Sequence, residues 1–203
     1  MNPKKFIIPG IILAGTLLLL AMYFPGLRPE RPNNRLIEGS VAIGGTFTLI
    51  DQTNKPVTSD ALKGKFTLVY FGFTHCPDIC PLTLANMTQA VSITGPLADD
   101  LIPVFITVDP ERDTVQVMAE YVANFHPRFL ALTGTPEQVR QATSAYRVYF
   151  KKAKIQTPDD YMMDHSGFVY LMDRTGNYVT HFKSDILPEQ MAAQIRQAMD
   201  PRH

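Results

Sequence analysis

A strand of the buried type that runs straight into a cysteine-containing turn constrains this chain more than any other feature of its sequence. Residues 66–73 (FTLVYFGF) are a nearly continuous run of apolar, aromatic and β-branched side chains. Such a run predicts a central strand that is covered on both faces. The turn that follows, HCPDICP, holds both cysteines of the 203-residue chain, Cys76 and Cys80. The sequence therefore predicts a fold in which two thiols lie at the end of a central strand.

The prolines of this turn indicate where the next helix begins. A helix that opened at Pro77 would carry Pro81 inside it, which costs about 3 kcal/mol. Proline at the first helical position loses no hydrogen bond. We therefore expect the helix to begin at Pro81, with Cys80 near its N-cap and Cys76 on the turn before it. Both sulfurs would then lie near the positive end of a helix dipole, which favours the thiolate.

Strands and helices alternate along the rest of the folded region. Further strands are predicted for four apolar runs, at 46–50, 101–108, 167–172 and 178–182. Helices are predicted for three segments with apolar side chains at helical spacing, at 114–125, 135–146 and 188–199. A strand, a cysteine turn and a helix, then a late hairpin and helix, is the order of a thioredoxin-like fold. We therefore expect an α/β fold with a mixed central sheet.

The N-terminal part of the chain has the composition of a membrane anchor. Residues 6–24 (FIIPGIILAGTLLLLAMYF) contain no charged side chain and are long enough to cross a hydrocarbon core as a helix. No small-x-small cleavage pattern follows them, so we expect an uncleaved anchor rather than a removed signal peptide. The positive charges that flank this segment leave its orientation open. The predicted organisation is a cytoplasmic N-terminus, a transmembrane helix, a linker and a folded domain, at 1–5, 6–24, 25–39 and 40–203.

The charge of the chain argues against one class of partner. Nineteen basic and nineteen acidic side chains cancel, and no lysine- or arginine-rich block is present. Nothing in this pattern favours binding to a phosphate backbone. We therefore expect no nucleic-acid partner.

The cysteine pair admits three interpretations on its spacing alone. A structural disulfide is one, although closing so short a loop removes little chain entropy and adds little stability. A redox-active dithiol formed by Cys76 and Cys80 is another, although the motif is one residue longer than the Cys-x-x-Cys of thioredoxins. A metal site is the interpretation we favour, because two soft thiolates on one turn suit Cu(I) or Zn.

Among the five histidines, His165 is the strongest candidate for a third ligand. It directly precedes a predicted core strand, and in a thioredoxin-like sheet that position lies beside the cysteine turn. The other four are expected to lie in solvent, on a strand or on the far side of the turn: His75, His126, His181 and His203.

Five blocks of sequence, taken in order, resemble the Sco/SenC family. They are residues 70–81 (YFGFTHCPDICP), 108–114 (VDPERDT), 132–135 (LTGT), 146–149 (YRVY) and 164–166 (DHS). The resemblance extends over roughly residues 40–200, and the N-terminal anchor fits it too. This combination of blocks is far more specific than the cysteine spacing alone.

The resemblance implies a copper protein with a thioredoxin-like fold that acts in assembly of the copper A centre of cytochrome c oxidase. By position, Cys76, Cys80 and His165 match the metal ligands of the family, for copper as Cu(I) and Cu(II). The implied role is a metallochaperone rather than an enzyme. Its implied partners are the copper A-bearing subunit and an upstream periplasmic copper donor. The alternative is a thiol–disulfide oxidoreductase in which Cys76 and Cys80 keep the cysteines of the target reduced.

The resemblance also bears on location. Members of the family face the periplasm or the mitochondrial intermembrane space. The N-terminus of this chain has no arginine-rich, serine-rich transit sequence. These features favour a single-pass protein of a bacterial inner membrane, with its folded domain in the periplasm, over a mitochondrial one.

Side chains beside the expected ligands carry weaker expectations. Asp164 is expected either to orient His165 or to cap its turn. Met162 and Met163 are expected to pack against apolar neighbours rather than to bind metal. For Asp109 and Asp113 we expect a structured loop, with Asp113 or Thr114 capping the next helix, in preference to a hard-metal pair.

Overall fold

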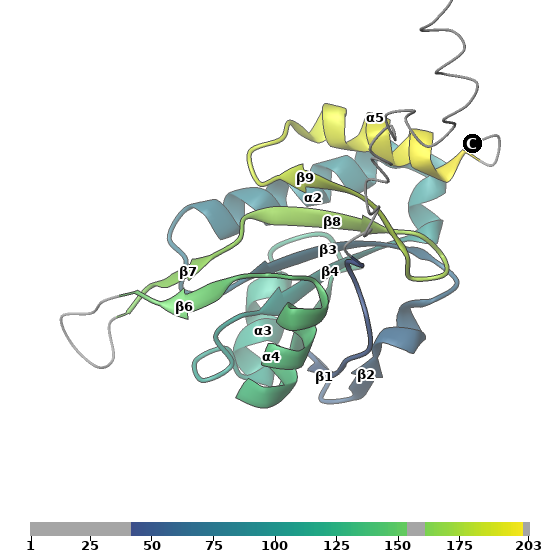
Figure 1. Cartoon of the computed structure of the whole chain (residues 1–203). Coiled ribbons are helices and arrows are strands. Elements are labelled where there is room, and N and C mark those ends of the chain that lie inside the picture. The colour runs from purple at the N-terminus through teal and green to yellow at the C-terminus, as the bar shows by residue number, and fades with distance from the viewer. Residues whose placement is uncertain (1–41, 154–160, 201–203) are drawn as a thin grey trace, which may run out of the picture. The chain divides into compact units, whose positions relative to one another are not determined.

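The computed structural model describes residues 42–153 and 161–200 (Figure 1). The predicted anchor at 6–24 and the predicted linker at 25–39 both precede these residues and lie outside the described part of the chain. Across the two described ranges, no helix has the length and apolarity to cross a membrane.

A seven-stranded mixed sheet forms the centre of the described domain, in the order β2-β1-β5-β4-β3-β8-β9 (Figure 1). Its parallel strands are β3 (Phe66–Gly72), β4 (Leu101–Thr107) and β5 (Leu130–Thr133). Antiparallel strands extend it on both sides: β1 (Thr48–Asp51), β2 (Pro56–Thr58), β8 (Phe168–Met172) and β9 (Tyr178–Lys183). The prediction of an α/β fold with a mixed sheet is confirmed.

The central strand β3 is covered on both faces, as its composition predicts. All seven of its residues are buried. Its neighbours are β4 on one side and β8 on the other, so its backbone is paired along both edges. The cysteine turn follows the C-terminal end of β3. Its first residues are therefore attached to a strand that is buried throughout.

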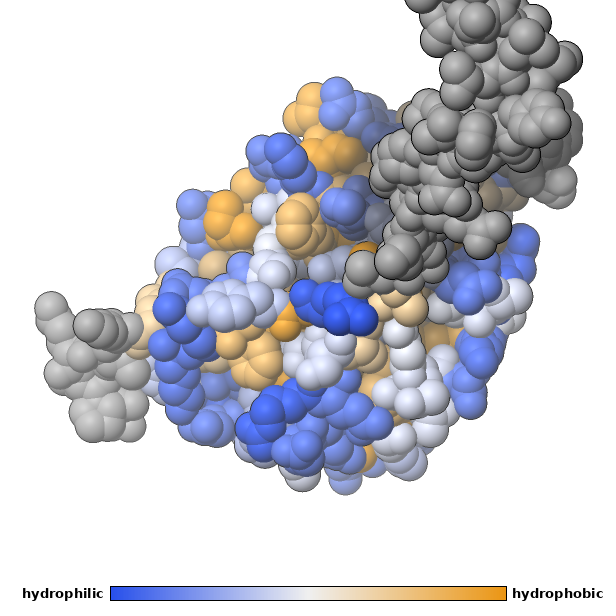
Figure 2. Space-filling model, viewed as in Figure 1, coloured by the Kyte–Doolittle hydropathy of each residue, from blue (hydrophilic) through white to orange (hydrophobic). Residues whose placement is uncertain are grey.

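Four α-helices cover the sheet in the described residues (Figure 1). They are α2 (Ile79–Thr94), α3 (Val115–Val122), α4 (Pro136–Ala145) and α5 (Pro188–Met199), with short 3-10 helices η2 (Ser59–Leu62) and η3 (Gly95–Asp100). Helices α2 and α5 pack against each other, and α3 and α4 lie on the opposite face. Figure 2 shows hydrophilic residues over α4, whose buried side is limited to three residues. The predicted capping box of Thr135 and Gln138 is present.

The helix after the cysteine turn begins earlier than predicted. Helix α2 begins at Ile79 with Asp78 as its N-cap, so Cys80 lies in the first turn and Pro81 is the third helical residue. The first four N–H groups of a helix have no acceptor within it, and Pro81 therefore loses no hydrogen bond at this position. The helix thus tolerates proline beyond its first residue, and Cys80 is carried on the helix rather than before it.

A short second sheet was not predicted. Strands β6 (Phe150–Lys152) and β7 (Met163–His165) form an antiparallel hairpin apart from the main sheet, with Phe150 opposite His165. Each strand has three residues, too few for an alternating pattern to be recognised. This hairpin carries His165 to the site.

Candidate metal centre

The two cysteines lie side by side at the start of α2 and differ in burial. Cys80 is fully buried, whereas Cys76 is half-buried, and both are free thiols. The backbone N–H of Cys80 donates to Sγ of Cys76 over 3.4 Å. Amide groups in the first turn of a helix point outward without partners, so the helix start supplies a donor to this sulfur.

The two thiols therefore titrate in opposite directions. The hydrogen bond from the Cys80 thiol lowers the pKa of Cys76 to about 5, and backbone N–H groups of Asp78 and Cys80 act in the same sense. The pKa of Cys80 is raised, because its proton is held in the bond to Cys76 and because it is buried. At neutral pH the pair carries one negative charge, on Cys76, and one proton, on Cys80.

His165 presents an unprotonated nitrogen to the cysteines. Its Nε2 lies 3.6 Å from Sγ of Cys80, and its Nδ1 lies 3.1 Å from the carbonyl oxygen of Ser166. A carbonyl only accepts hydrogen bonds, so Nδ1 carries the proton and Nε2 has a free lone pair. Burial lowers the pKa of His165, which favours this neutral form. Neutral imidazole is the form that binds a metal ion.

Aromatic side chains of β3 and the residue after it surround His165 and Cys80. The rings of Tyr70 and Phe73 meet the imidazole of His165 edge-on, with centroid distances of 6.1 and 5.9 Å. The Tyr70 hydroxyl also donates to Sγ of Cys80 over 3.5 Å. Gly72 provides the space for that sulfur, since a Cβ at this position would lie 2.8 Å from it. The last residues of β3 thus shape one wall of the site.

The three predicted ligands are brought together without forming a finished coordination group. In residues 42–153 and 161–200, no three or more His, Cys, Asp or Glu side chains are arranged to hold a metal ion. Cys80 contacts both other residues, through the bond from its N–H to Sγ of Cys76 and through the approach of Nε2 of His165 to its own sulfur. A common ion would therefore require these side chains to rearrange. Cys76 is the less buried of the two cysteines.

The other described histidines have partners of their own. Nδ1 of His75 lies 3.1 Å from Oγ1 of Thr74 and 3.7 Å from Oδ1 of Asp113. His181 contacts the Tyr178 hydroxyl over 2.5 Å on β9, and His126 accepts from the backbone N–H of Arg128. His203 lies outside the described residues.

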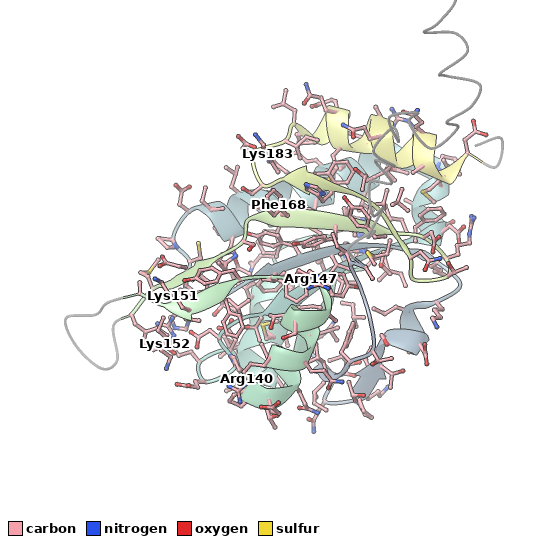
Figure 3. The ribbon with its side chains drawn as sticks, in the orientation of Figure 1. Arg140, Arg147, Lys151, Lys152, Phe168 and Lys183 are labelled. Atoms are coloured by element: carbon pink, nitrogen blue, oxygen red, sulfur yellow. The ribbon has the colours of Figure 1, made fainter. Side chains whose placement is uncertain are left out.

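The residues that flank His165 differ in part from expectation. Asp164 is exposed, and its carboxylate lies 3.9 Å from Nζ of Lys151, which is labelled on β6 in Figure 3. The proton acceptor for the His165 ring is the backbone of Ser166 instead. Met163 packs in the core as expected, but Met162, which directly precedes β7, is exposed.

The aspartates after β4 are both buried. Thr114 is the N-cap of α3, and its Oγ1 accepts from the N–H of Val117 over 3.3 Å. Asp113 does not cap that helix: its carboxylate accepts instead from Thr74, in the cysteine turn. The Asp109 carboxylate accepts from Arg112 and from the Tyr161 hydroxyl. The sequence gives no signal of the contact between Asp113 and Thr74 or of the contact between Asp109 and Tyr161.

Comparison with known proteins covers the same region of the chain. A family model described as SCO1/SenC matches residues 37–200. A SCO2-like protein of Rickettsia conorii is 43% identical over 201 residues, which cover 96% of this chain and 97% of the relative. ScoI of Bradyrhizobium japonicum, solved with copper bound, is 44% identical with a TM-score of 0.72, covering 77% of this chain and 99% of ScoI. BsSco, described as a member of the Sco family of cytochrome c oxidase assembly proteins, shares the fold at 22% identity, with a TM-score of 0.62 and coverage of 79% and 96%.

Proposed function

The chain belongs to the SCO1/SenC family, and from this membership we propose that it is a copper metallochaperone that prepares the copper A site of cytochrome c oxidase. On this proposal Cys76, Cys80 and His165 hold copper as cargo. The observation that carries the proposal is the 3.6 Å approach of Nε2 of His165 to Sγ of Cys80, with the lone pair of the ring facing the thiol pair. The copper-bound relative ScoI and the description of the family as oxidase assembly proteins support the same role.

The donor set suits copper in both oxidation states. Two thiolates and an imidazole combine soft and borderline donors, which hold Cu(I) and Cu(II) without demanding one geometry. Cys76 is already a thiolate at neutral pH and His165 is already neutral. Cys80 must give up its proton to bind, so copper uptake releases a proton from the buried thiol. The half-buried Cys76 is the ligand that a thiolate of the target reaches first.

The asymmetry of the thiols favours a second candidate function, that of a thiol–disulfide oxidoreductase. The Cys76 thiolate attacks one sulfur of a disulfide in the target, and one target thiolate leaves. Cys80 then loses its proton and attacks the Cys76 sulfur, which releases the second target thiolate. The target gains two electrons, and the chain ends with a Cys76–Cys80 disulfide that a dithiol reductant must reopen. The two functions are compatible, because copper must meet reduced thiols.

We place this function at a bacterial inner membrane, with residues 6–24 as a single-pass anchor and the folded domain in the periplasm. The apolar span and the polar segment after it support this arrangement. Tethering raises the effective concentration of the domain near a membrane-bound target, so weak contact suffices for transfer. Alkaline phosphatase fused after residue 203 should be active, since it requires export. A fluorescent fusion that folds in the cytoplasm would contradict the orientation.

Transfer to an isolated copper A domain separates the two functions. In the first mixture, the chain loaded with copper is added to a copper A domain whose cysteines are reduced and which holds no metal. In the second, the reduced chain without metal is added to the same domain with its cysteines joined in a disulfide. A metallochaperone yields the copper A absorption in the first mixture. An oxidoreductase yields free target thiols in the second. A loaded chain that gives no copper to the reduced target would contradict copper delivery.

A further inference from the structure

The loop between β4 and α3 contains two buried carboxylates. Asp109 is 1% exposed and Asp113 is 0% exposed. We call residues 109–113 the acidic loop. Burying a carboxylate is costly unless hydrogen bonds compensate. The partners of these two side chains therefore show what the loop holds in place.

Asp113 holds the cysteine turn. Its Oδ2 accepts from the backbone N–H of Thr74 over 3.0 Å and from Oγ1 of Thr107 over 2.6 Å. Its Oδ1 accepts from Oγ1 of Thr74 over 2.5 Å. Thr74 lies two residues before Cys76, and Thr107 ends strand β4. One carboxylate thus ties the base of the cysteine turn to the end of the neighbouring strand.

Asp109 holds the residue that leads into the histidine strand. Its Oδ1 accepts from the Tyr161 hydroxyl over 2.7 Å, and its Oδ2 accepts from Nε of Arg112 over 2.6 Å. The Arg112 guanidinium lies 3.6 Å from the centroid of the Tyr161 ring. Nζ of Lys152 lies 4.4 Å from the same centroid and 2.6 Å from Oε2 of Glu111. The acidic loop therefore contacts Tyr161 twice, through a hydrogen bond from its hydroxyl to Asp109 and through the Arg112 guanidinium over its ring.

These contacts attach both strands of the hairpin that carries His165. Tyr161 comes just before β7, in which His165 is the last residue. Lys152, labelled in Figure 3, is the last residue of β6 and pairs with Met163 of β7. The hairpin is thus fastened to the acidic loop from both of its strands, at the end away from His165.

Hydrogen bonds also connect Asp109 and Asp113 to each other, directly and through Thr107. The Asp109 N–H donates to Oγ1 of Thr107 over 2.8 Å, and that hydroxyl donates to Asp113. The Asp113 N–H donates to the Asp109 carbonyl over 3.0 Å. A shift of one carboxylate is therefore transmitted to the other. In the described residues, no hydrogen bond or ion pair joins either carboxylate to Cys76, Cys80 or His165.

Building on the function proposed above, we propose that the acidic loop is a positioning element that sets the separation between the cysteine turn and His165. Asp113 fixes the cysteine side through Thr74. Asp109 fixes the histidine side through Tyr161. Both are positioning residues, since they act on the copper ligands through other side chains.

Tyr161→Phe tests the histidine side, because it removes the hydroxyl and keeps the ring that contacts Arg112 and Lys152. Loss of an outer-shell contact typically weakens metal binding about 10- to 100-fold, and we expect Cu(II) affinity to fall in this range. The matched control is Tyr149→Phe, because Tyr149 directly precedes β6 and its side chain is 57% exposed. In a His165→Ala background, Tyr161→Phe should cause no further loss. An equal loss in both backgrounds would mean a general structural effect and would overturn the assignment.

Asp113→Asn tests the cysteine side without copper. The structure with free thiols contains the three hydrogen bonds to Asp113, so weakening them should shift the equilibrium between dithiol and Cys76–Cys80 disulfide toward the disulfide. One such bond corresponds to about five-fold in the equilibrium constant. Thr74→Val, which removes one donor, provides a milder variant if Asp113→Asn does not fold. Asp185→Asn, at an exposed loop position, is the control.

The copper-free readouts separate this proposal from the proposed function. Hydrogen exchange of the β6–β7 amides should accelerate in Tyr161→Phe, and the dithiol equilibrium should shift in Asp113→Asn, even in a chain that binds no copper. A dithiol equilibrium in Asp113→Asn and Thr74→Val that matches the Asp185→Asn control would overturn the proposal, as would unchanged hairpin exchange in Tyr161→Phe.

Discussion

Sγ of Cys80 lies 3.6 Å from Nε2 of His165, across 85 positions of sequence. The helix that carries the cysteine and the hairpin that carries the histidine meet at the end of β3. The carbonyl of Ser166 holds the proton of the imidazole on the far nitrogen. The ring therefore presents the free lone pair of Nε2 to the cysteine.

Replacing His165 by alanine should separate copper retention from thiol chemistry. Copper affinity should fall by more than the roughly 10- to 100-fold typical of losing an outer-shell partner, since a ligand itself is removed. Reaction of the reduced pair with a small disulfide should persist, because thiol–disulfide exchange does not need the imidazole. Competition with a copper chelator and stopped-flow disulfide exchange measure the two properties. Undiminished copper affinity would remove His165 from the site.

The pH dependence of alkylation should distinguish the two cysteines. The Cys80 thiol lowers the pKa of Cys76 to about 5, so the Cys76 thiolate is fully formed at pH 7 and is lost as the pH falls through 5. Reaction of Cys76 with iodoacetamide should follow that curve, whereas buried Cys80 should stay unmodified at neutral pH. Mass spectrometry of the alkylated peptides measures both.

The variant Cys80→Ala provides the control for that curve. It removes the thiol that donates to Cys76, so the midpoint for Cys76 should move up toward the value of about 8.5 for a free cysteine. An unchanged midpoint in Cys80→Ala would contradict the assigned cause of the lowered pKa.

Adding one methyl group at Gly72 should damage the site from within. A Cβ there would lie 2.8 Å from Sγ of Cys80 and 3.0 Å from the rings of Tyr70 and Phe105, all of which are buried. Overpacking of this kind costs about 1–3 kcal/mol. We expect Gly72→Ala to lower the free energy of unfolding by that amount and to weaken copper binding. Gly134→Ala, where the Cβ meets the end of the Gln138 side chain, should leave copper affinity unchanged.

Asp164→Asn should have little effect despite its place beside His165. The carboxylate is exposed, and its ion pair with Lys151 spans 3.9 Å between two exposed groups. Such surface pairs contribute about 0–1 kcal/mol. We expect copper affinity to change less than about ten-fold, below the usual range for an outer-shell partner. A larger loss in a chelator competition would show that Asp164 orients the imidazole.

The sequence predicts the parts of this fold that have a strong local pattern. Strand β3 is apolar throughout, and the capping box of Thr135 and Gln138 lies within four residues, so both are recognisable. The start of α2 was misplaced because a proline tolerated in the first helical turn looks the same in sequence as a proline that must open the helix. The β6–β7 hairpin was missed because its strands are three residues long.

The site could be predicted only in part, for a similar reason. The proposed ligand set rests on the family resemblance, since Cys76, Cys80 and His165 occupy recognisable blocks. The role of the buried aspartates does not, because their partners are distant in sequence. Thr74 lies 39 positions from Asp113, and Tyr161 lies 52 positions from Asp109. Contacts of this range come from topology, which no local pattern encodes.

X-ray absorption at the copper edge tests the central claim most directly, on the reduced full-length chain in detergent loaded with one equivalent of copper. The account predicts two sulfur ligands and one imidazole nitrogen, with one sulfur lost in Cys76→Ser and in Cys80→Ser and the imidazole lost in His165→Ala. Copper coordinated without two sulfurs, or with the same ligands in the parent and in all three variants, would contradict it.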